Sequence, residues 1–367
     1  MIPVNEPVIG AQETAYVEEC LRTGWISSSG RFIDEFEEKW AEYCGMKHGI
    51  AVSNGTVALQ LAVSCLDLEP GDEIIMPTFT IVSCALAAIY NGAVPILVDC
   101  DPDTWCMDVG QVESKITPRT RAIMPVHIYG HPVDMDPLRE LADRCGLIII
   151  EDAAEAHGAE YKGRTCGGLG DIGCFSFYAN KIITTGEGGM VLTSDDEYAE
   201  SARSRRNLCF RDDRRFWHTE LGHNFRLTNM QAALGVGQVE RIDELVARKR
   251  KVGHAYTRAL AGLPLQLPVE REWATNVYWM YGVVLDGSTG MTAAEFARRL
   301  AERGVQTRPF FTGMHEQPVF RDMELFTGES YPVAERLALQ GLYLPSGLAL
   351  TDGQVAETVA AVREVLA

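Results

Sequence analysis

The strongest constraint on the fold is an alternation, between residues 50 and about 195, of short apolar runs with segments of helical pattern. The apolar runs cover residues 73–76, 95–98, 122–126, 147–150, 174–178 and 189–192. Helical patterns precede or separate them at 56–67, 81–90 and 136–145. Runs that are apolar at nearly every position are typical of strands covered on both faces. The alternation therefore predicts an α/β fold with a mostly parallel central sheet.

The last third of the chain predicts a second, smaller unit. Residues 228–262 have the pattern of one or two long helices. A strand is expected at 277–285, and helices at 293–303, 333–339 and 354–366. We therefore expect a large domain over residues 1–245 and a small C-terminal α+β domain over residues 246–367.

An aromatic stripe marks the N-terminal region. Phe32, Phe36, Trp40 and Tyr43 follow one another at spacings of three and four residues. That spacing places side chains on one face of a helix, so the stripe predicts a helix packed on the core.

Charge and cysteine usage exclude several classes of function. The chain has 33 basic and 51 acidic residues, a net charge of −18, which disfavours binding to nucleic acid or an anionic membrane surface. No run of 18 apolar residues predicts a transmembrane helix, and the first residues lack the pattern of a signal peptide. The ten cysteines are scattered without a Cys-x-x-Cys pair, as expected for buried thiols of a reduced, cytoplasmic protein.

Three segments carry residues suited to chemistry, and the first is Ser53-Asn54-Gly55-Thr56, just ahead of the helix expected at 57–66. Small residues at a helix start leave backbone N–H groups free at its positive end, which suits a phosphate. The same residues also suit a plain helix cap made by Asn54 or Thr56.

The second segment is the acidic pair Glu151-Asp152, which follows the apolar run 147–150. Ligand groups gather at the carboxyl ends of the strands in α/β sheets. A carboxylate buried there needs a cation, because its desolvation is otherwise costly. A metal, an arginine, a protonated ring nitrogen and a structural salt bridge all remain open from the pattern alone.

The third segment places Lys181 after the apolar run 174–178 and before the glycine-rich turn 184–189. Burial lowers the pKa of a lysine and frees its amine to attack a carbonyl. Asp152 and Lys181 lie 29 residues apart, about the length of one loop followed by one further strand. A phosphate seat, a buried carboxylate and a buried lysine together point to one cofactor, pyridoxal 5'-phosphate.

Other patterns are weaker. Residues 168–173 match Gly-x-Gly-x-x-Gly, but a strand pattern follows where dinucleotide binding requires a helix. His127 and His131 are four residues apart, yet Gly130 and Pro132 break a helix between and beside them, so no metal site is expected. The arginines between 203 and 215 suit either a nucleotide diphosphate or a solvated or dimer-contact face.

Taken together, these segments resemble the sugar-nucleotide aminotransferases of the DegT/DnrJ/EryC1/StrS family. The resemblance covers nearly the whole chain and is carried by residues 24–28, 151–154, 176–189, 224–229, 308–310 and 314–315. It implies a fold-type-I pyridoxal-phosphate aminotransferase fold, with pyridoxamine phosphate as the aminated form of the cofactor. It also implies a homodimer whose active sites are shared across the interface.

The resemblance implies cofactor-binding roles for the matching residues. Lys181 would be the catalytic residue, bonded to the aldehyde carbon of the cofactor, and Asp152 would keep the pyridine nitrogen protonated. The phosphate would be held by Gly55, Thr56 and Ser176, with Asn224 reaching it from the neighbouring subunit.

The resemblance also implies a substrate. Residues 177–189 and 278–281 are most similar to those of family members that aminate GDP-4-keto-6-deoxy-mannose at C4 with L-glutamate as donor. A UDP- or dTDP-linked keto-deoxy-hexose is the alternative. Dehydratases of the same fold carry histidine in place of the lysine, which disfavours that activity here. The substrate-binding residues implied are Ser27, His127, Phe310 and His315.

Two positions depart from the family pattern. Glu155 stands where glutamine is frequent, and an ionised carboxylate accepts hydrogen bonds but cannot donate one to the phenolate oxygen of the cofactor. Glu155 is therefore expected either to be protonated or to point away. In many members an aromatic residue covers the ring after Pro-x-x-Thr, but here Ile81 follows that motif, so Phe79 or Ile81 would cover the ring.

Overall fold

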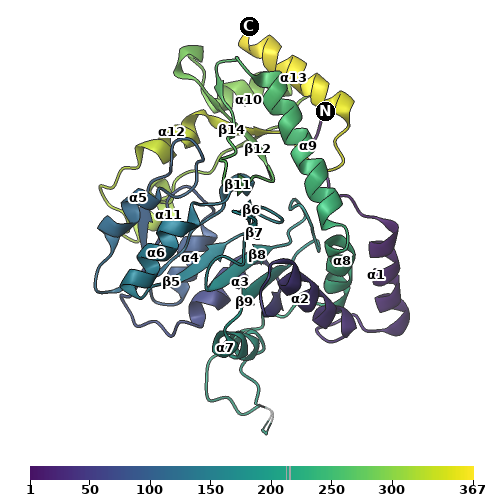
Figure 1. Cartoon of the computed structure of the whole chain (residues 1–367), viewed down its shortest axis with the longest axis vertical. Helices are drawn as coiled ribbons and strands as arrows, with labels where there is room; N and C mark the ends of the chain where they lie inside the picture. Colours follow the sequence, from purple (N-terminus) through teal and green to yellow (C-terminus); the bar gives the residue numbers. More distant parts are fainter. Residues whose placement is uncertain (212, 215) are drawn as a thin grey trace.

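The computed structural model describes residues 1–211, 213–214 and 216–367, and its centre is a seven-stranded sheet of order β1-β9-β8-β5-β4-β2-β3 (Figure 1). Strands β2 to β5 and β8 pair in parallel, whereas β9 runs antiparallel to both of its neighbours. The predicted α/β fold with a mostly parallel sheet is thus confirmed. The strands are β1 (His48–Val52), β2 (Glu73–Pro77), β3 (Val94–Val98), β4 (Thr120–Ile123), β5 (Ile148–Asp152), β8 (Ile172–Ser176) and β9 (Gly189–Thr193).

Helices cover the sheet, and the aromatic stripe lies on one of them. Phe32, Phe36 and Trp40 of α2 are fully buried, with the Trp40 ring edge-on to Phe175 of β8 at 4.9 Å. The predicted core-packing helix is therefore confirmed. The helices of this part are α1 (Ala11–Thr23), α2 (Arg31–Tyr43), α3 (Gly55–Ser64), α4 (Ser83–Tyr90), α5 (Val109–Val112), α6 (Met135–Cys145), α7 (Asp196–Arg206) and α8 (Asn229–Val239).

A second hydrophobic core joins residues from position 252 onward with Ile2 (top of Figure 1). The strand expected from residue 277 begins only at Tyr281, because Tyr278 has a left-handed φ of 50° that interrupts extended backbone. The helices and strands of this C-terminal part of the chain are α9 (Ile242–Leu260), β10 (Leu265–Gln266), β12 (Tyr281–Leu285), α10 (Ala293–Ala301), β13 (Arg308–Pro309), α11 (Pro318–Asp322), α12 (Pro332–Gln340), β14 (Gly341–Leu344) and α13 (Asp352–Leu366).

Helix α9 runs without a break through position 245, so a domain boundary there stays a prediction. A small three-stranded sheet, which the sequence did not predict, consists of β6 (Glu160–Tyr161), β7 (Arg164–Thr165) and β11 (Ala274–Thr275). Short 3-10 helices are η1 (Glu113–Lys115), η2 (Ile128–Gly130), η3 (Gly287–Thr289) and η4 (Met314–Glu316).

The N-terminal segment ties the second core to the loop that carries Lys181. The N–H of Ile2 donates to the carbonyl of Gly304 at 2.7 Å, and the carbonyl of Val4 accepts from Ser346 at 3.0 Å. The side-chain amide of Asn5 then donates to the carbonyl of Asn180 at 2.7 Å. Residues far apart in the sequence thereby hold the backbone next to Lys181.

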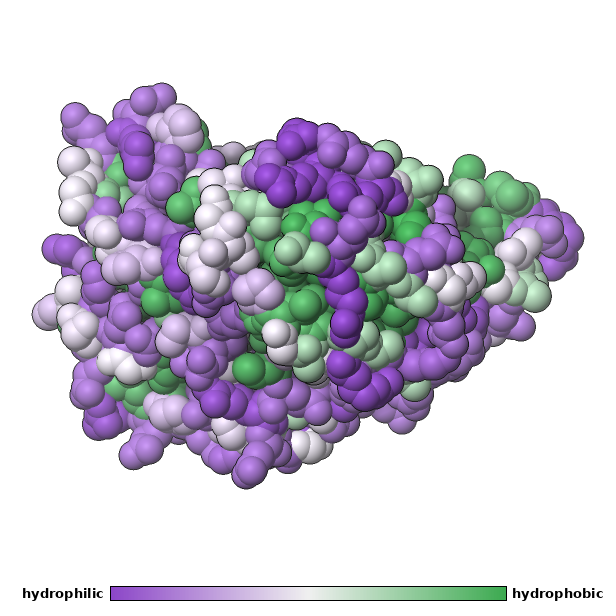
Figure 2. All heavy atoms as spheres, turned by 90° about the horizontal axis from the view of Figure 1, so that it is seen from above, coloured by the Kyte–Doolittle hydropathy of each residue, from purple (hydrophilic) through white to green (hydrophobic). Residues whose placement is uncertain are grey.

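The face that carries α13 is mostly hydrophilic. Seen from the end that carries α13, apolar residues show through toward the middle of a largely hydrophilic face (Figure 2). In the described part of the chain, no helix combines the length and the apolar character that a membrane span requires.

Lys249 of α9 gives a prediction for stability. Its side chain is buried and donates to the carbonyl of Ser346, and burial lowers its pKa to about 7 from 10.5. Between pH 10.5 and 7 the folded protein binds fewer protons at Lys249 than the unfolded chain does. Burial of Lys249 therefore costs no stability above pH 10.5, and its cost grows as the pH falls toward 7. We expect Lys249→Met to raise the free energy of unfolding at pH 7 by about 2 kcal/mol.

Urea unfolding at pH 6 to 10 checks this prediction, and the gain is expected to vanish toward pH 10. Lys251→Met is the matched control, since Lys251 is exposed on the same helix and pairs with the exposed Asp352. A Lys249→Met variant with the same pH dependence as the wild-type protein would contradict the account.

Candidate active site

A cavity of about 680 Å³ lies at the carboxyl ends of β5 and β8, a size typical of small-molecule sites. Asp152 ends β5, Ser176 ends β8, and both line the cavity. The structure brings together there the predicted residues Gly55, Thr56, Asp152, Glu155, Ser176 and Lys181.

Lys181 and Glu155 face each other electrostatically in this cavity. Burial lowers the pKa of Lys181, while the carboxylates of Glu155 and Asp152 oppose that shift. Burial raises the pKa of Glu155 to about 7, and its Oε2 accepts the backbone N–H of Tyr129 at 2.7 Å. One oxygen of Glu155 is thus used by the backbone, and burial favours the protonated form of its carboxyl.

Glu151 and Asp152, at the end of β5, have different surroundings, because successive side chains of a strand point to opposite faces of the sheet. Asp152 faces the cavity, where its oxygens accept the N–H of Ala154 and the thiol of Cys84, each at 3.1 Å. Within the described residues, no arginine pairs with Asp152 and no cluster of metal-ligating groups includes it. Its carboxylate therefore remains available to a cationic group of a ligand.

Glu151 lies on the opposite side and is fully buried. Its carboxylate accepts the N–H groups of Gly167 at 2.7 Å, Leu169 at 2.6 Å and Gly170 at 2.5 Å. Nε2 of His127 donates to it at 2.9 Å, while Nδ1 of the same ring accepts the N–H of Val133 at 3.0 Å. These contacts fix the neutral tautomer of His127 and make Glu151 a structural carboxylate.

The start of α3 forms another wall of the cavity. Asn54 caps the helix by accepting the N–H of Val57 at 3.0 Å, so the capping interpretation holds for Asn54. The N–H groups that precede Val57 have no intrahelical acceptor. A Cβ at Gly55 would lie 2.6 Å from Cβ of Ser176, so only glycine leaves room at this point of the cavity. The helix start and Ser176 together can seat an anion.

Several predicted substrate-binding residues do not reach the cavity. His127 is enclosed by Glu151 and Val133 as described, and Phe310 is buried against the ring of Tyr129 at 4.8 Å. Nδ1 of His315 lies 2.9 Å from Oγ1 of Thr78, and its Nε2 lies 3.2 Å from Glu335. These histidines and Phe310 support the fold around the site in this subunit.

Ser27 and Asn224 also lie outside the cavity, and both are exposed. The carbonyl of Ser27 accepts the N–H of Asn229 at 2.6 Å. The backbone of Asn224 forms a bridge with Asn207. Their exposure leaves their side chains available to a second subunit, and their roles stay predictions.

Of the arginines between 203 and 215, Arg205, Arg206 and Arg211 pair with carboxylates of the same chain. Arg205 contacts Asp67 at 2.5 Å, and Arg211 contacts Asp213 at 2.9 Å. Arg215 lies outside the described residues. These ion pairs favour the interpretation of this stretch as a solvated or dimer-contact face over a nucleotide-binding one.

The structure also adds residues that sequence reasoning did not assign. Asn180, Trp279, Phe311 and Tyr343 line the cavity, and Trp279 lies in a segment that the family resemblance had already singled out. Ile81 lines the cavity and is 46% exposed, whereas Phe79 is 1% exposed within an aromatic cluster. Of the two candidates, Ile81 is therefore the one that reaches the cavity.

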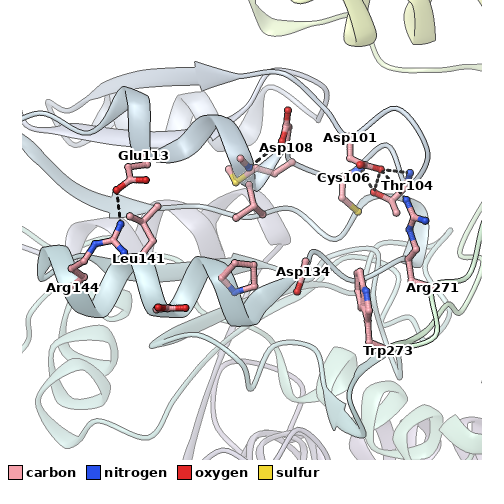
Figure 3. A pocket seen from close by; sticks show the side chains of 15 residues that line it. Asp101, Thr104, Cys106, Asp108, Glu113, Asp134, Leu141, Arg144, Arg271 and Trp273 are labelled. Carbon is pink, nitrogen blue, oxygen red and sulfur yellow. Dashed lines mark hydrogen bonds and ion pairs between the residues drawn. The ribbon is translucent and has the colours of Figure 1, made fainter.

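A second hollow lies away from Lys181, between the 101–110 loop, α5 and α6 (Figure 3). Leu141 and Trp273 line it; Arg144 pairs with Glu113 at 2.5 Å, and the hydroxyl of Thr104 donates to Asp101 at 2.9 Å. None of the predicted site residues lines this hollow.

Known proteins resemble this chain over nearly its whole length. Residues 7–363 match the DegT/DnrJ/EryC1/StrS aminotransferase family. GDP-perosamine synthase of Caulobacter vibrioides is 45% identical over 100% of this chain and 98% of its own length. The enzyme of the same name from Escherichia coli O157:H7 is 42% identical over 96% of this chain and 95% of its own.

Among solved structures, DesV of S. venezuelae, in complex with a ketimine intermediate, superposes with a TM-score of 0.91. It is 38% identical and is aligned over 99% of this chain and 98% of its own. The match therefore extends over both cores of the fold. The chain belongs to the DegT/DnrJ/EryC1/StrS aminotransferase family.

Proposed function

We propose that the chain is a pyridoxal-phosphate-dependent aminotransferase that converts GDP-4-keto-6-deoxy-D-mannose to GDP-perosamine with L-glutamate as amino donor. The observation that carries the proposal is the meeting of Lys181, Asp152 and the start of α3 in one cavity. The 45% and 42% identity to two GDP-perosamine synthases supports this sugar nucleotide over a UDP- or dTDP-linked one.

The residues of the cavity fit the cofactor. The start of α3 with Gly55, Thr56 and Ser176 would hold the phosphate, since unpaired N–H groups at a helix start favour an anion. The carboxylate of Asp152, with which no arginine of the described chain pairs, would hold a proton on the pyridine nitrogen. Bound pyridoxal phosphate supplies an aldehyde carbon and an electron-withdrawing ring.

Lys181 would perform two tasks. Because burial lowers its pKa, a fraction of its amine is neutral and able to bond to the aldehyde carbon. Displaced by the amino group of glutamate, the freed amine would carry a proton between two carbon atoms as general base and then general acid. The keto-sugar would receive the amine by the reverse sequence, so we expect ping-pong kinetics.

Asn224 supports a homodimer with shared sites. It is exposed and outside the cavity of its own subunit, which suits a residue that contacts the phosphate in the neighbouring subunit.

The substrate is tested by mass analysis of the product formed from GDP-4-keto-6-deoxy-mannose and L-glutamate. We expect an amino sugar still linked to GDP, together with 2-oxoglutarate. Amination of UDP- or dTDP-linked keto-deoxy-hexoses, with none of the GDP-sugar, would contradict the assigned nucleotide while leaving the class of reaction intact.

Glu155 gives a prediction on the cofactor itself. Below its pKa of about 7, the carboxyl can donate to the phenolate oxygen, and above it the carboxylate only accepts. We expect the visible absorbance of the cofactor-loaded protein to change across pH 7 in the wild type. In Glu155→Gln, whose amide donates at every pH, that change should be absent. An identical transition in both proteins would assign it to another group.

A further inference from the structure

Trp279 makes two contacts that converge on Lys181. Nζ of Lys181 lies over its indole ring, 3.7 Å from the centroid. Its indole N–H donates to the carbonyl of Asn180, the residue before Lys181, at 2.9 Å. Trp279 itself is 4% exposed and stacks on the ring of Tyr129, so its position is fixed by packing.

The carbonyl of Asn180 receives a second donor, the side-chain amide of Asn5, at 2.7 Å. The backbone of Asn5 packs closely against Gly347, since a Cβ added at Gly347 would lie only 2.8 Å from the Cα of Asn5. Asn5 and Trp279, from two distant segments, therefore both donate to the backbone carbonyl that precedes Lys181. Of these two residues, only Trp279 also contacts the amine of Lys181.

The charged and titratable groups around the amine are Asp152, Glu155 and His157. The two carboxylates favour its charged form, while burial favours its neutral form. Burial and the nearby Lys181 lower the pKa of His157 to about 3, so that ring is neutral at pH 7. An indole face attracts an ammonium by about 0.5–1 kcal/mol at exposed sites and about 2 kcal/mol when desolvated. Trp279 thus adds to the stability of the charged amine.

We propose that Trp279 is the positioning residue of Lys181, whose ring holds the unbonded amine inside the cavity and whose indole N–H fixes the backbone beneath it. The role in amino transfer rests on the proposed function, whereas the contact with the free amine does not. Whenever the amine of Lys181 is not covalently bonded, its contact with the indole ring keeps it inside the cavity.

The first test uses the cofactor-free, full-length protein. Lys181 is methylated with formaldehyde and cyanoborohydride over a series of pH values, and the modified peptide is quantified by mass spectrometry. Only the neutral amine reacts, so the midpoint of the rate profile reports the pKa of Lys181. For Trp279→Leu we expect the midpoint to fall by about one pH unit, the equivalent of a desolvated cation–π contact.

Two further variants separate the contacts. Trp279→Phe keeps an aromatic face but loses the N–H, so its midpoint should fall by less than that of Trp279→Leu. Trp105→Leu is the matched control, because Trp105 is equally buried and packs on Phe310 at 5.3 Å. It should keep the wild-type midpoint. The proposal would be overturned by a wild-type midpoint in Trp279→Leu, or by a midpoint in Trp105→Leu that shifts as much as that of Trp279→Leu. If Trp279→Leu does not fold, a wild-type midpoint in Trp279→Phe would overturn it.

The second test follows the reaction of the cofactor-loaded protein with glutamate by its absorbance. Trp279→Leu should lower kcat with little change in the KM for glutamate, and Asn5→Ala should lower kcat less, since it removes a single donor to Asn180. A rise in KM with kcat intact would overturn the positioning role. A wild-type protein that binds no cofactor would overturn the proposed function, and the methylation profile would still decide the role of Trp279.

Discussion

Lys181→Ala is expected to lower amino transfer by roughly 10⁴-fold or more, because it removes both the group that bonds to the aldehyde carbon and the general acid–base. The start of α3 and Asp152 are left in place, so the variant should still bind the cofactor without a covalent bond. Added glutamate should change the cofactor absorbance within seconds in the wild type and not on that timescale in the variant.

Lys162→Ala is the matched control for this experiment. Lys162 is exposed and pairs with Asp136 at 2.5 Å, away from the cavity. Its replacement should leave turnover within about twofold of the wild type. Retention of more than a tenth of the activity by Lys181→Ala would remove the basis of the assigned chemistry, as would an absorbance that glutamate changes in neither protein.

The second large effect concerns stability. We expect Glu151→Leu to lose about 4 kcal/mol or more of the free energy of unfolding. It leaves the N–H groups of Gly167, Leu169 and Gly170 and the ring N–H of His127 without an acceptor. Each unsatisfied buried donor costs about 1–3 kcal/mol, and the whole fold is stable by only about 5–15 kcal/mol. Relief of carboxylate burial offsets part of this loss.

Urea unfolding measures the effect. Glu151→Gln keeps the size of the side chain and one acceptor oxygen, so it should lose distinctly less stability than Glu151→Leu. An unchanged urea midpoint in Glu151→Leu would show that the buried carboxylate is not the anchor of these four donors.

The sheet was predictable because its strands are apolar at nearly every position. The runs at 73–76 and 189–192 coincide closely with β2 and β9. The same reasoning missed β1, whose five residues begin with His48 and Gly49, and the two-residue strands of the small sheet, which are too short to show a period. It also placed the start of β12 too early, because the left-handed turn at Tyr278 leaves no signal in a hydrophobic pattern.

The part of the cavity formed by Asp152 and Lys181 was predictable from local motifs, because both residues follow the ends of strands. The part formed by the C-terminal residues was not. Phe311, Trp279 and Tyr343 reach the cavity from three separate segments of the C-terminal part, and only the folded chain brings them together. The distinct roles of Glu151 and Asp152 follow from strand alternation, but the acceptors and donors that face each of them depend on loops remote in the sequence.

The most direct test of the account is borohydride reduction of the purified protein, followed by peptide mass spectrometry. The account predicts a single pyridoxyl adduct on the peptide that contains Lys181, lost when glutamate is added before the reductant. An adduct confined to a different lysine, or a protein purified with the cofactor added that yields none, would contradict it.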